Sequence, residues 1–304
     1  MFSAISRTLA ALTQPSPVGY VAARMQIVHD PSSMAAFHGC ALVPTMGALH
    51  DGHGSLIRRA RLHGLPVVAT VFVNPTQFAP HEDFGKYPRT LDRDVALATQ
   101  CGADAVFAPA AEDVYPAGPE ASRQEAEAWP LPPVACEPGL EDACRPGHFG
   151  GVCQVVARLF DLCRPAVAVF GEKDWQQLRV ITAMAEGLAG RWPGLRIEPA
   201  PTVRDPDGLA MSSRNRYLRP EQREQALGLV RALQMAASAQ RPATAEALMR
   251  STLEAHGLAV DYAVVRDART LLPVQGFERP TRGLIAARLD TVRLIDNMAL
   301  PICR

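Results

Sequence analysis

The chain has 304 residues, 48% hydrophobic and 20% charged, and its 31 basic and 31 acidic side chains give a formal net charge of zero. Such a chain can bury a large core, but it has no electrostatic drive toward nucleic acid or a membrane surface. No apolar stretch approaches the roughly 20 residues that span a bilayer. Seven cysteines without a CxxC pair favour reduced thiols in the cytoplasm over a disulfide framework or structural zinc.

Residues 1–24 are expected to form an N-terminal extension that need not be ordered. Residues 1–29 contain no Asp or Glu but include Arg7 and Arg24, a composition typical of transit peptides. The alternatives are a frayed extension and a translation start at Met25, where the string MQIV already reads as a first strand.

Residues 25–200 alternate short apolar runs with helical patterns. The apolar runs predict strands at 25–28, 41–43, 67–73, 105–107, 166–170 and around Ile197. The helical patterns predict helices at 53–63, at 90–100, around 152–160 and from Trp175 onward. This alternation predicts an α/β fold with a doubly wound, Rossmann-like parallel sheet.

Two later regions follow other patterns. The proline-rich stretch 109–146 is long for a structureless loop, so it is either functional or a cover over the site. Beyond the boundary, placed between Pro193 and Asp205, a second and smaller α+β domain is expected over residues 201–304. Its helices are predicted at 220–239 and 243–256, and its short strands at 262–265, 283–287 and 293–294.

The stretch 41–60, ALVPTMGALHDGHGSLIRRA, reads as a buried strand, a tight turn and the start of a helix. His50 and His53 are three residues apart in that first helical turn, so both rings lie on one helical face. Free backbone N–H groups and the positive end of the helix dipole lie beside them, which favours phosphate binding.

Three more polar clusters follow predicted strands: NPTQF at 74–78, GEKD at 171–174 and MSSRN at 211–215. Because the carboxyl ends of parallel strands share one edge, all four clusters are expected to converge on one crevice. They supply cations and hydrogen-bond donors, which suit a polyanion. A G-x-S-x-G elbow, an HExxH zinc site, a P-loop and a GxGxxG turn are all missing from the sequence.

Each cluster also has a purely structural explanation. His50 and His53 could cap the helix or lie at the surface. Asp174 and Gln177 have the D-x-x-Q spacing of a capping box. The two serines of MSSRN could cap a turn, and the lysine of GEKD could be an exposed charge.

Longer strings resemble a known family. HDGH and MSSRN resemble the HIGH and KMSKS motifs of a nucleotidyltransferase superfamily. PTMGALHDGH, FVNPTQF, KYPRT, RPGHF, FGEKDWQQL, TVRDPDGLAMSSRNRYL and RLIDN run in order from about Met25 to Asn297 and are similar to the pantoate–β-alanine ligase family. The resemblance implies ATP-dependent condensation of (R)-pantoate with β-alanine, through a pantoyl adenylate, in pantothenate and coenzyme A biosynthesis. It also implies a homodimer and a requirement for Mg²⁺.

The resemblance further implies roles for individual residues. His53 would be the proton donor, Gln77 and Gln177 would hold pantoate, and Asp94 would be a candidate Mg²⁺ ligand. The catalytic residues implied are His50, His53, Lys173, Ser212, Ser213 and Arg214. The ATP-binding residues implied are Met46, Gly47, Ala48, Leu49, His50, Asp51, Gly52, His53, Gly171, Glu172, Lys173, Asp174, Val203, Met211, Ser212, Ser213 and Arg214. The further pocket residues implied are Asn74, Tyr87 and Arg145.

Two other functions stay open at this point. A relative could activate a different acid while sharing the ATP half of the site, and Gln77 and Gln177 discriminate here because they belong to the acid pocket. A non-catalytic nucleotide-binding protein is the other alternative, against which both histidines and Lys173 argue.

Overall fold

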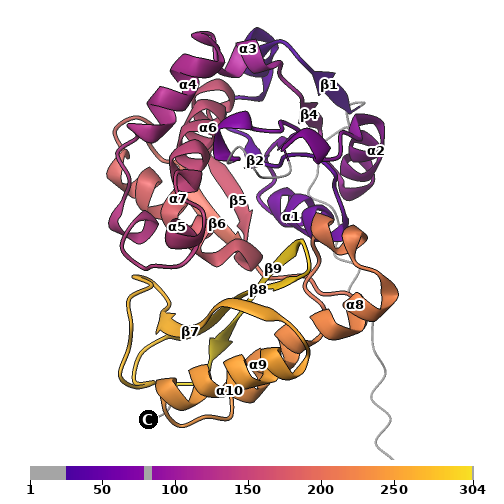
Figure 1. Ribbon diagram of the computed structural model, residues 1–304. Helices are drawn as coiled ribbons and strands as arrows, with labels where there is room; N and C mark the ends of the chain where they lie inside the picture. Colours follow the sequence, from indigo (N-terminus) through magenta and orange to yellow (C-terminus); the bar gives the residue numbers. More distant parts are fainter. Residues whose placement is uncertain (1–24, 79–83, 303–304) are drawn as a thin grey trace, which may run out of the picture.

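The computed structural model describes residues 25–78 and 84–302, so the expectation for residues 1–24 lies outside the described residues. Its larger part is a six-stranded parallel sheet in the order β1–β4–β3–β2–β5–β6, with helices on both faces (Figure 1). The strands are β1 Gln26–Val28, β2 Ala41–Val43, β3 Val67–Thr70, β4 Ala105–Phe107, β5 Val167–Gly171 and β6 Arg196–Ala200. This confirms the predicted doubly wound α/β sheet.

Alternation along each strand divides the core between the two faces of the sheet. Leu42, Val68 and Phe107 pack on one face with the longest helix, whereas Val43 and Val106 pack on the other. Burial on both faces explains why these strands read as unbroken apolar runs in the sequence. The covering helices are α1 Asp51–Arg61 and α2 Leu91–Cys101 on one side, and α6 His148–Cys163 and α7 Trp175–Gly187 on the other.

The strand order reverses between β2 and β5. From β2 the chain builds outward through β3 to β4, and from β5 it builds in the opposite direction to β6. In open α/β sheets the crevice beyond the carboxyl ends of the strands at such a reversal is where ligands bind. The polar clusters after β2 and β5 therefore flank that crevice.

The proline-rich stretch departs from the expectation of an irregular region. It contains helices α3 Ala111–Val114, α4 Gly118–Glu127 and α5 Glu141–Cys144, with 3₁₀ turns η3 Phe84–Lys86 before it and η4 Pro133–Ala135 inside it. Pro119 lies in the first turn of α4, where a missing N–H group costs nothing, so this proline starts a helix instead of breaking one.

Three smaller boundaries also differ from the prediction. Helix α1 begins at Asp51, two residues early, because His50 serves as its N-cap. Strand β3 ends at Thr70 rather than at residue 73. The expected helix 220–239 is two helices, α8 Pro220–Ala226 and α9 Gly228–Ala236. The short segment between β1 and β2 forms a 3₁₀ helix, η1 Pro31–Phe37.

The C-terminal part carries a three-stranded antiparallel sheet, β7 Ala259–Asp267, β8 Thr281–Leu289 and β9 Val292–Leu300. One face packs on α9 and on α10 Pro242–Ala255, and the other packs on Leu140 and Trp175 of the larger part (Figure 1). The strands are longer than predicted because charged residues such as Asp261 and Arg288 interrupt the apolar pattern. No helix among the described residues is long and apolar enough to cross a membrane.

Candidate active site

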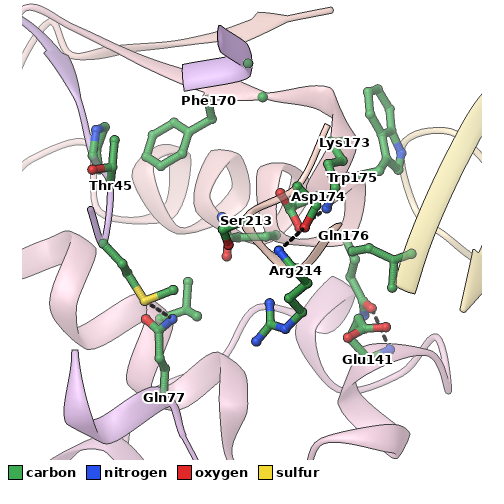
Figure 2. Close-up of a pocket in the computed structure, with 18 of the residues that line it drawn as sticks. Thr45, Gln77, Glu141, Phe170, Lys173, Asp174, Trp175, Gln176, Ser213 and Arg214 are labelled. Atoms are coloured by element: carbon green, nitrogen blue, oxygen red, sulfur yellow. Dashed lines mark hydrogen bonds and ion pairs between the residues drawn. The ribbon is translucent and has the colours of Figure 1, made fainter. Parts of the chain in front are cut away.

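A cleft of about 260 Å³ opens between the two sheets, beyond the carboxyl ends of β2 and β5 (Figure 2). All four polar clusters contribute to it. Of the residues expected from the sequence, the cleft is lined by Met46, His50, Gly52, His53, Asn74, Gln77, Tyr87, Arg145, Gly171, Lys173, Asp174, Gln177, Val203, Met211, Ser212, Ser213 and Arg214. The structure thus brings together most of the expected site.

The two histidines cap α1 and line the cleft at the same time. Nδ1 of His50 accepts a hydrogen bond from the Gly52 amide at 3.2 Å, and Nδ1 of His53 accepts one from the His50 amide at 3.3 Å. A neutral imidazole that accepts at one nitrogen carries its proton on the other. The caps therefore leave Nε2–H of each ring as a donor. The capping explanation is correct, but it does not compete with a functional one.

Burial keeps both rings uncharged. It lowers the pKa of His50 to about 4, and the nearby positive charge of Lys173 acts in the same direction. Burial lowers the pKa of His53 to about 3, helped by His50 and Lys173. At neutral pH each ring is thus a hydrogen-bond donor without a positive charge. Lys173 and the arginines supply the charge for a polyanion.

The turn η5 Glu172–Asp174 brings a cation and a carboxylate to the cleft. Nζ of Lys173 lies 3.5 Å from Oδ1 of Asp174, and both residues line the opening (Figure 2). Asp174 holds the N-cap position of α7, yet its side chain makes no capping hydrogen bond. The capping-box explanation of Asp174 is therefore wrong, and its half-exposed carboxylate faces the cleft.

Gln77 is held by a buried asparagine. The fully buried Asn74 donates from Nδ2 to Oε1 of Gln77 at 3.2 Å and to the Gly151 carbonyl at 3.0 Å. With its oxygen engaged in this way, Gln77 turns its amide nitrogen toward Sδ of Met46, at 2.9 Å (Figure 2). Asn74 thus supports the pocket, and it also caps the 3₁₀ turn η2 Pro75–Gln77 that follows it.

A short hairpin carries the MSSRN segment, residues 211–215, which is called the serine–arginine loop below. An isolated bridge pairs Arg204 with Ala210, and the Met211 amide donates to the Val203 carbonyl at 3.0 Å. Oγ of Ser212 then accepts from the Arg214 amide at 3.3 Å and caps η6 Ser213–Tyr217, which confirms the turn-capping explanation for Ser212. Ser213 and Arg214 face the cleft (Figure 2).

A family model described as Pantoate-beta-alanine ligase matches residues 21–299. The chain belongs to the pantoate–β-alanine ligase family. Among curated relatives, the pantothenate synthetase of Myxococcus xanthus is 48% identical over 271 residues, which covers 86% of this chain and 89% of the relative. The pantothenate synthetase of Geobacter sulfurreducens is 44% identical over 290 residues, or 91% and 99% of the two chains.

Solved structures of the family agree with this fold. The pantothenate synthetase from Thermus thermophilus is 41% identical, with a TM-score of 0.82 over 91% of this chain and 100% of that one. A pantoate–β-alanine ligase from Francisella tularensis, complexed with β-γ ATP and β-alanine, is 29% identical, with a TM-score of 0.71 over 91% and 98%. The chain is a ligase of this family, and the alternative of a non-catalytic protein is set aside.

Asp94 has a different place from the one expected in a pantoate–β-alanine ligase site. It is 1% exposed and does not line the cleft. Its carboxylate accepts from the amides of Ala48 at 3.0 Å and Leu49 at 2.7 Å, and from the hydroxyl of Thr90. These contacts place the Asp94 carboxylate inside the protein, and its expected role as a Mg²⁺ ligand stays a prediction. Gly47, with a φ of +84°, also lies outside the lining, because its backbone turns around this carboxylate.

Glu172 and Asp51 were expected to bind ATP, and that expectation stays a prediction. Neither lines the cleft. The Glu172 carboxylate turns toward β8 and pairs with Arg282 at 2.8 Å, whereas Asp51 is an exposed residue in the first turn of α1. The segment 46–53 therefore reaches the cleft only through part of its length, because the amides at 47–49 are already hydrogen-bonded within the protein.

Several cleft residues of this ligase were not assigned from the sequence. Nε2 of His148 accepts a hydrogen bond from Arg145 at 2.9 Å, and its Nδ1–H donates to the Gln77 carbonyl oxygen at 3.0 Å. Glu141 is buried and receives hydrogen bonds from Tyr262 and Arg293. The strings RPGHF and RLIDN contain His148 and residues 293–297 of β9, so the family resemblance had already singled out both segments. The pairing of Glu141 with the second sheet has no signal in a single sequence.

Proposed function

We propose that the cleft is the active site for ATP-dependent condensation of (R)-pantoate with β-alanine, giving pantothenate, AMP and pyrophosphate. The observation that carries this proposal is the convergence of His50, His53, Lys173 and the serine–arginine loop at the strand reversal, where Gln77 and Gln177 also line the cleft. Donors and cations bind a triphosphate, and the amide side chains bind a small hydroxy acid.

In the first step a carboxylate oxygen of pantoate attacks the α-phosphorus of ATP. The bond from that phosphorus to the bridging oxygen breaks, and pyrophosphate leaves with the electron pair. Negative charge grows on the phosphate oxygens, where the Nε2–H groups of His50 and His53 and the ammonium group of Lys173 stabilise it. These groups act by position and electrostatics, so the protein needs no nucleophile of its own.

In the second step the amine of β-alanine attacks the carbonyl carbon of the adenylate. The bond between that carbon and the AMP oxygen breaks, AMP leaves, and the attacking nitrogen releases its proton. Gln77 and Gln177 hold the pantoyl group through both steps. Tyr87 and Arg145 complete this half of the pocket, because both line the cleft and Arg145 contacts His148 beside Gln77.

The remaining contacts to ATP are proposed from the family resemblance, and the residues concerned line the cleft. Val203 packs on adenine, Asp174 lies near the ribose, and Ser212, Ser213 and Arg214 close over the phosphates. No cluster of three or more His, Cys, Asp or Glu side chains that could hold a metal occurs in the described part of the chain. The proposal has Mg²⁺ enter as MgATP, held largely by phosphates and water as this ion prefers.

We also propose that residues 25–200 and 201–304 are two domains, the second acting as a lid that admits ATP and then excludes water. The core formed by α9, α10 and the small sheet supports this division, since it shares no residue with the cores on the large sheet. A homodimer is proposed from the family resemblance. A reducing, cytoplasmic setting is proposed because the six described cysteines are free thiols.

One assay tests the function. Purified protein is incubated with ATP, Mg²⁺, pantoate and β-alanine, and AMP and pantothenate are measured together. We expect both products in equal amounts and neither without pantoate. AMP formation with another hydroxy acid but not with pantoate would assign the chain to a different acid, and no AMP with pantoate would overturn the proposal.

A further inference from the structure

Two neighbouring residues of β9, Asp296 and Asn297, lie at the edge of the cleft without a role in the reaction described above. They are 2% and 3% exposed, respectively, and belong to the RLIDN string. Buried polar side chains in a strand carry a desolvation cost unless every polar atom has a partner. Where their hydrogen bonds go therefore indicates what they hold.

Asn297 holds the turn η5, which carries Lys173 and is called the lysine loop below. Its Nδ2 donates to the backbone carbonyls of Glu172 at 3.0 Å and Lys173 at 2.8 Å. Its Oδ1 accepts from Nε of Arg282, which in turn pairs with Glu172 at 2.8 Å and lies 3.6 Å from the ring centre of Trp175. The second sheet thus grips the turn that carries Lys173 through its backbone, its acidic side chain and the following tryptophan.

Asp296 holds the root of the serine–arginine loop. Its two oxygens accept a bidentate pair of hydrogen bonds from Arg204, at 2.7 and 3.0 Å. Arg204 begins the hairpin whose other strand leads to Met211 and Ser212, and its Nη1 also reaches the Gly208 carbonyl at 3.2 Å. Arginine–carboxylate pairs of this fork geometry fix orientation as well as distance.

We propose that Asp296 and Asn297 are a pair of positioning residues that set the two cation-bearing loops of the cleft relative to each other. Both oxygens of Asp296, both side-chain N–H groups of Asn297 and the Asn297 side-chain oxygen have protein partners. The pair therefore acts through Lys173 and the serine–arginine loop and not by contact with substrate. Because the two residues are adjacent in one strand, both loops are anchored to the same element.

Two nearly isosteric substitutions test this assignment. Asn297→Asp places a carboxylate oxygen against two carbonyl oxygens, and Asp296→Asn places an amide against the Arg204 guanidinium group. Hydrogen–deuterium exchange is followed in the peptides 171–177 and 203–215. We expect Asn297→Asp to speed hydrogen–deuterium exchange in peptide 171–177 by about tenfold and to change it in peptide 203–215 by less than about threefold. For Asp296→Asn we expect the tenfold increase in peptide 203–215 and the small change in peptide 171–177.

The matched control is Thr281→Val in the neighbouring strand β8. Thr281 is 2% exposed, and its hydroxyl has no hydrogen-bond partner among the described residues. This variant should change exchange in neither peptide. If Asp296→Asn fails to fold, Arg204→Lys removes the bidentate fork while keeping its charge, and the same peptide 203–215 is measured. The assignment would be overturned if each substitution sped hydrogen–deuterium exchange in both peptides, or if neither substitution sped it in either peptide.

A kinetic test rests on the proposed function as well. Asn297→Asp should lower kcat for pantoate-dependent pyrophosphate release by about 10- to 100-fold, with the KM for ATP changed less than about threefold. In a Lys173→Ala background, Asn297→Asp should lower kcat by less than about threefold, because the substitution acts through the lysine. Full additivity would overturn the positioning role. If the wild-type chain releases no pyrophosphate with pantoate, the proposed function fails, whereas the exchange result still decides the positioning role.

Discussion

His50 and His53 combine a structural and a chemical task in one ring each. The cap that each Nδ1 provides to α1 fixes which nitrogen carries the proton, and burial keeps the ring neutral. In the proposed function, the remaining Nε2–H donors and the Lys173 ammonium group bind the triphosphate without having to reorganise, which is what makes such donors effective in a transition state.

Loss of one such donor should slow adenylate formation strongly. We expect His53→Ala or Lys173→Ala to reduce the rate of pantoate-dependent pyrophosphate release by on the order of 10²–10³, the usual effect of removing one transition-state donor. His38→Ala, at an exposed histidine, is the control and should leave the rate unchanged. A loss of about tenfold or less in either cleft variant would contradict the assigned roles.

The two buried histidines also predict how stability depends on pH. Their folded-state pKa values, about 4 and about 3, lie below the ordinary value of 6.5, so the unfolded chain binds more protons between these limits. Stability is therefore complete above about pH 6.5 and falls as the pH drops toward 4, by about 2 kcal/mol per histidine at pH 4.5.

Urea unfolding at pH 7 and pH 4.5 measures this effect. The His50→Gln/His53→Gln double variant should lose less stability on acidification than the wild-type chain, whereas His38→Gln should behave like the wild type. Equal losses in the double variant and the wild type would mean that the two rings are protonated in the folded state.

At the scale of elements, the contact between α6 and η2 positions the Gln77 side of the cleft, where pantoate is proposed to bind. A Cβ atom added at Gly151 would lie 2.4 Å from the Thr76 carbonyl oxygen, in the turn that presents Gln77. The same glycine carbonyl accepts the hydrogen bond from Asn74. Only glycine lets the helix approach this closely.

Gly151→Ala should therefore displace the turn. We expect destabilisation of about 1–3 kcal/mol, as for other overpacked cores, together with a raised KM for pantoate. Gly187→Ala in α7 is the matched control, because no atom lies within 4 Å of its added Cβ. Thermal melts and initial rates measure both variants. An unchanged KM for pantoate in Gly151→Ala would remove α6 from the account of this pocket.

Sequence patterns predicted the elements of the large sheet well, because strands buried on both faces read as apolar runs. They failed in the proline-rich stretch, because a proline can also lie in the first turn of a helix. Pro119 does so in α4, where a loop was expected. They also did not show the hydrogen-bond partners of Asp94, which are backbone amides 45 and 46 positions away along the chain. A carboxylate near a phosphate site reads as a metal ligand unless those amides are seen.

At the scale of the whole molecule, the small antiparallel sheet completes the site. Its strand β9 holds the lysine loop and the serine–arginine loop through Asn297 and Asp296, and Arg293 pairs with the buried Glu141 of the larger part. Figure 1 shows this sheet packed beneath the large one, with α9 and α10 on its outer side. No pattern within either part predicts these pairings, because each joins segments more than 90 residues apart.

The central claim is that a carboxylate oxygen of pantoate forms a bond to the α-phosphorus of ATP in this cleft and gives a pantoyl adenylate. Pantoate labelled with ¹⁸O in its carboxylate tests it directly when the products of complete turnover with β-alanine are analysed by mass spectrometry. The account predicts one ¹⁸O atom in the phosphate of AMP and none in pyrophosphate. Unlabelled AMP, or label in inorganic phosphate or pyrophosphate, would contradict it.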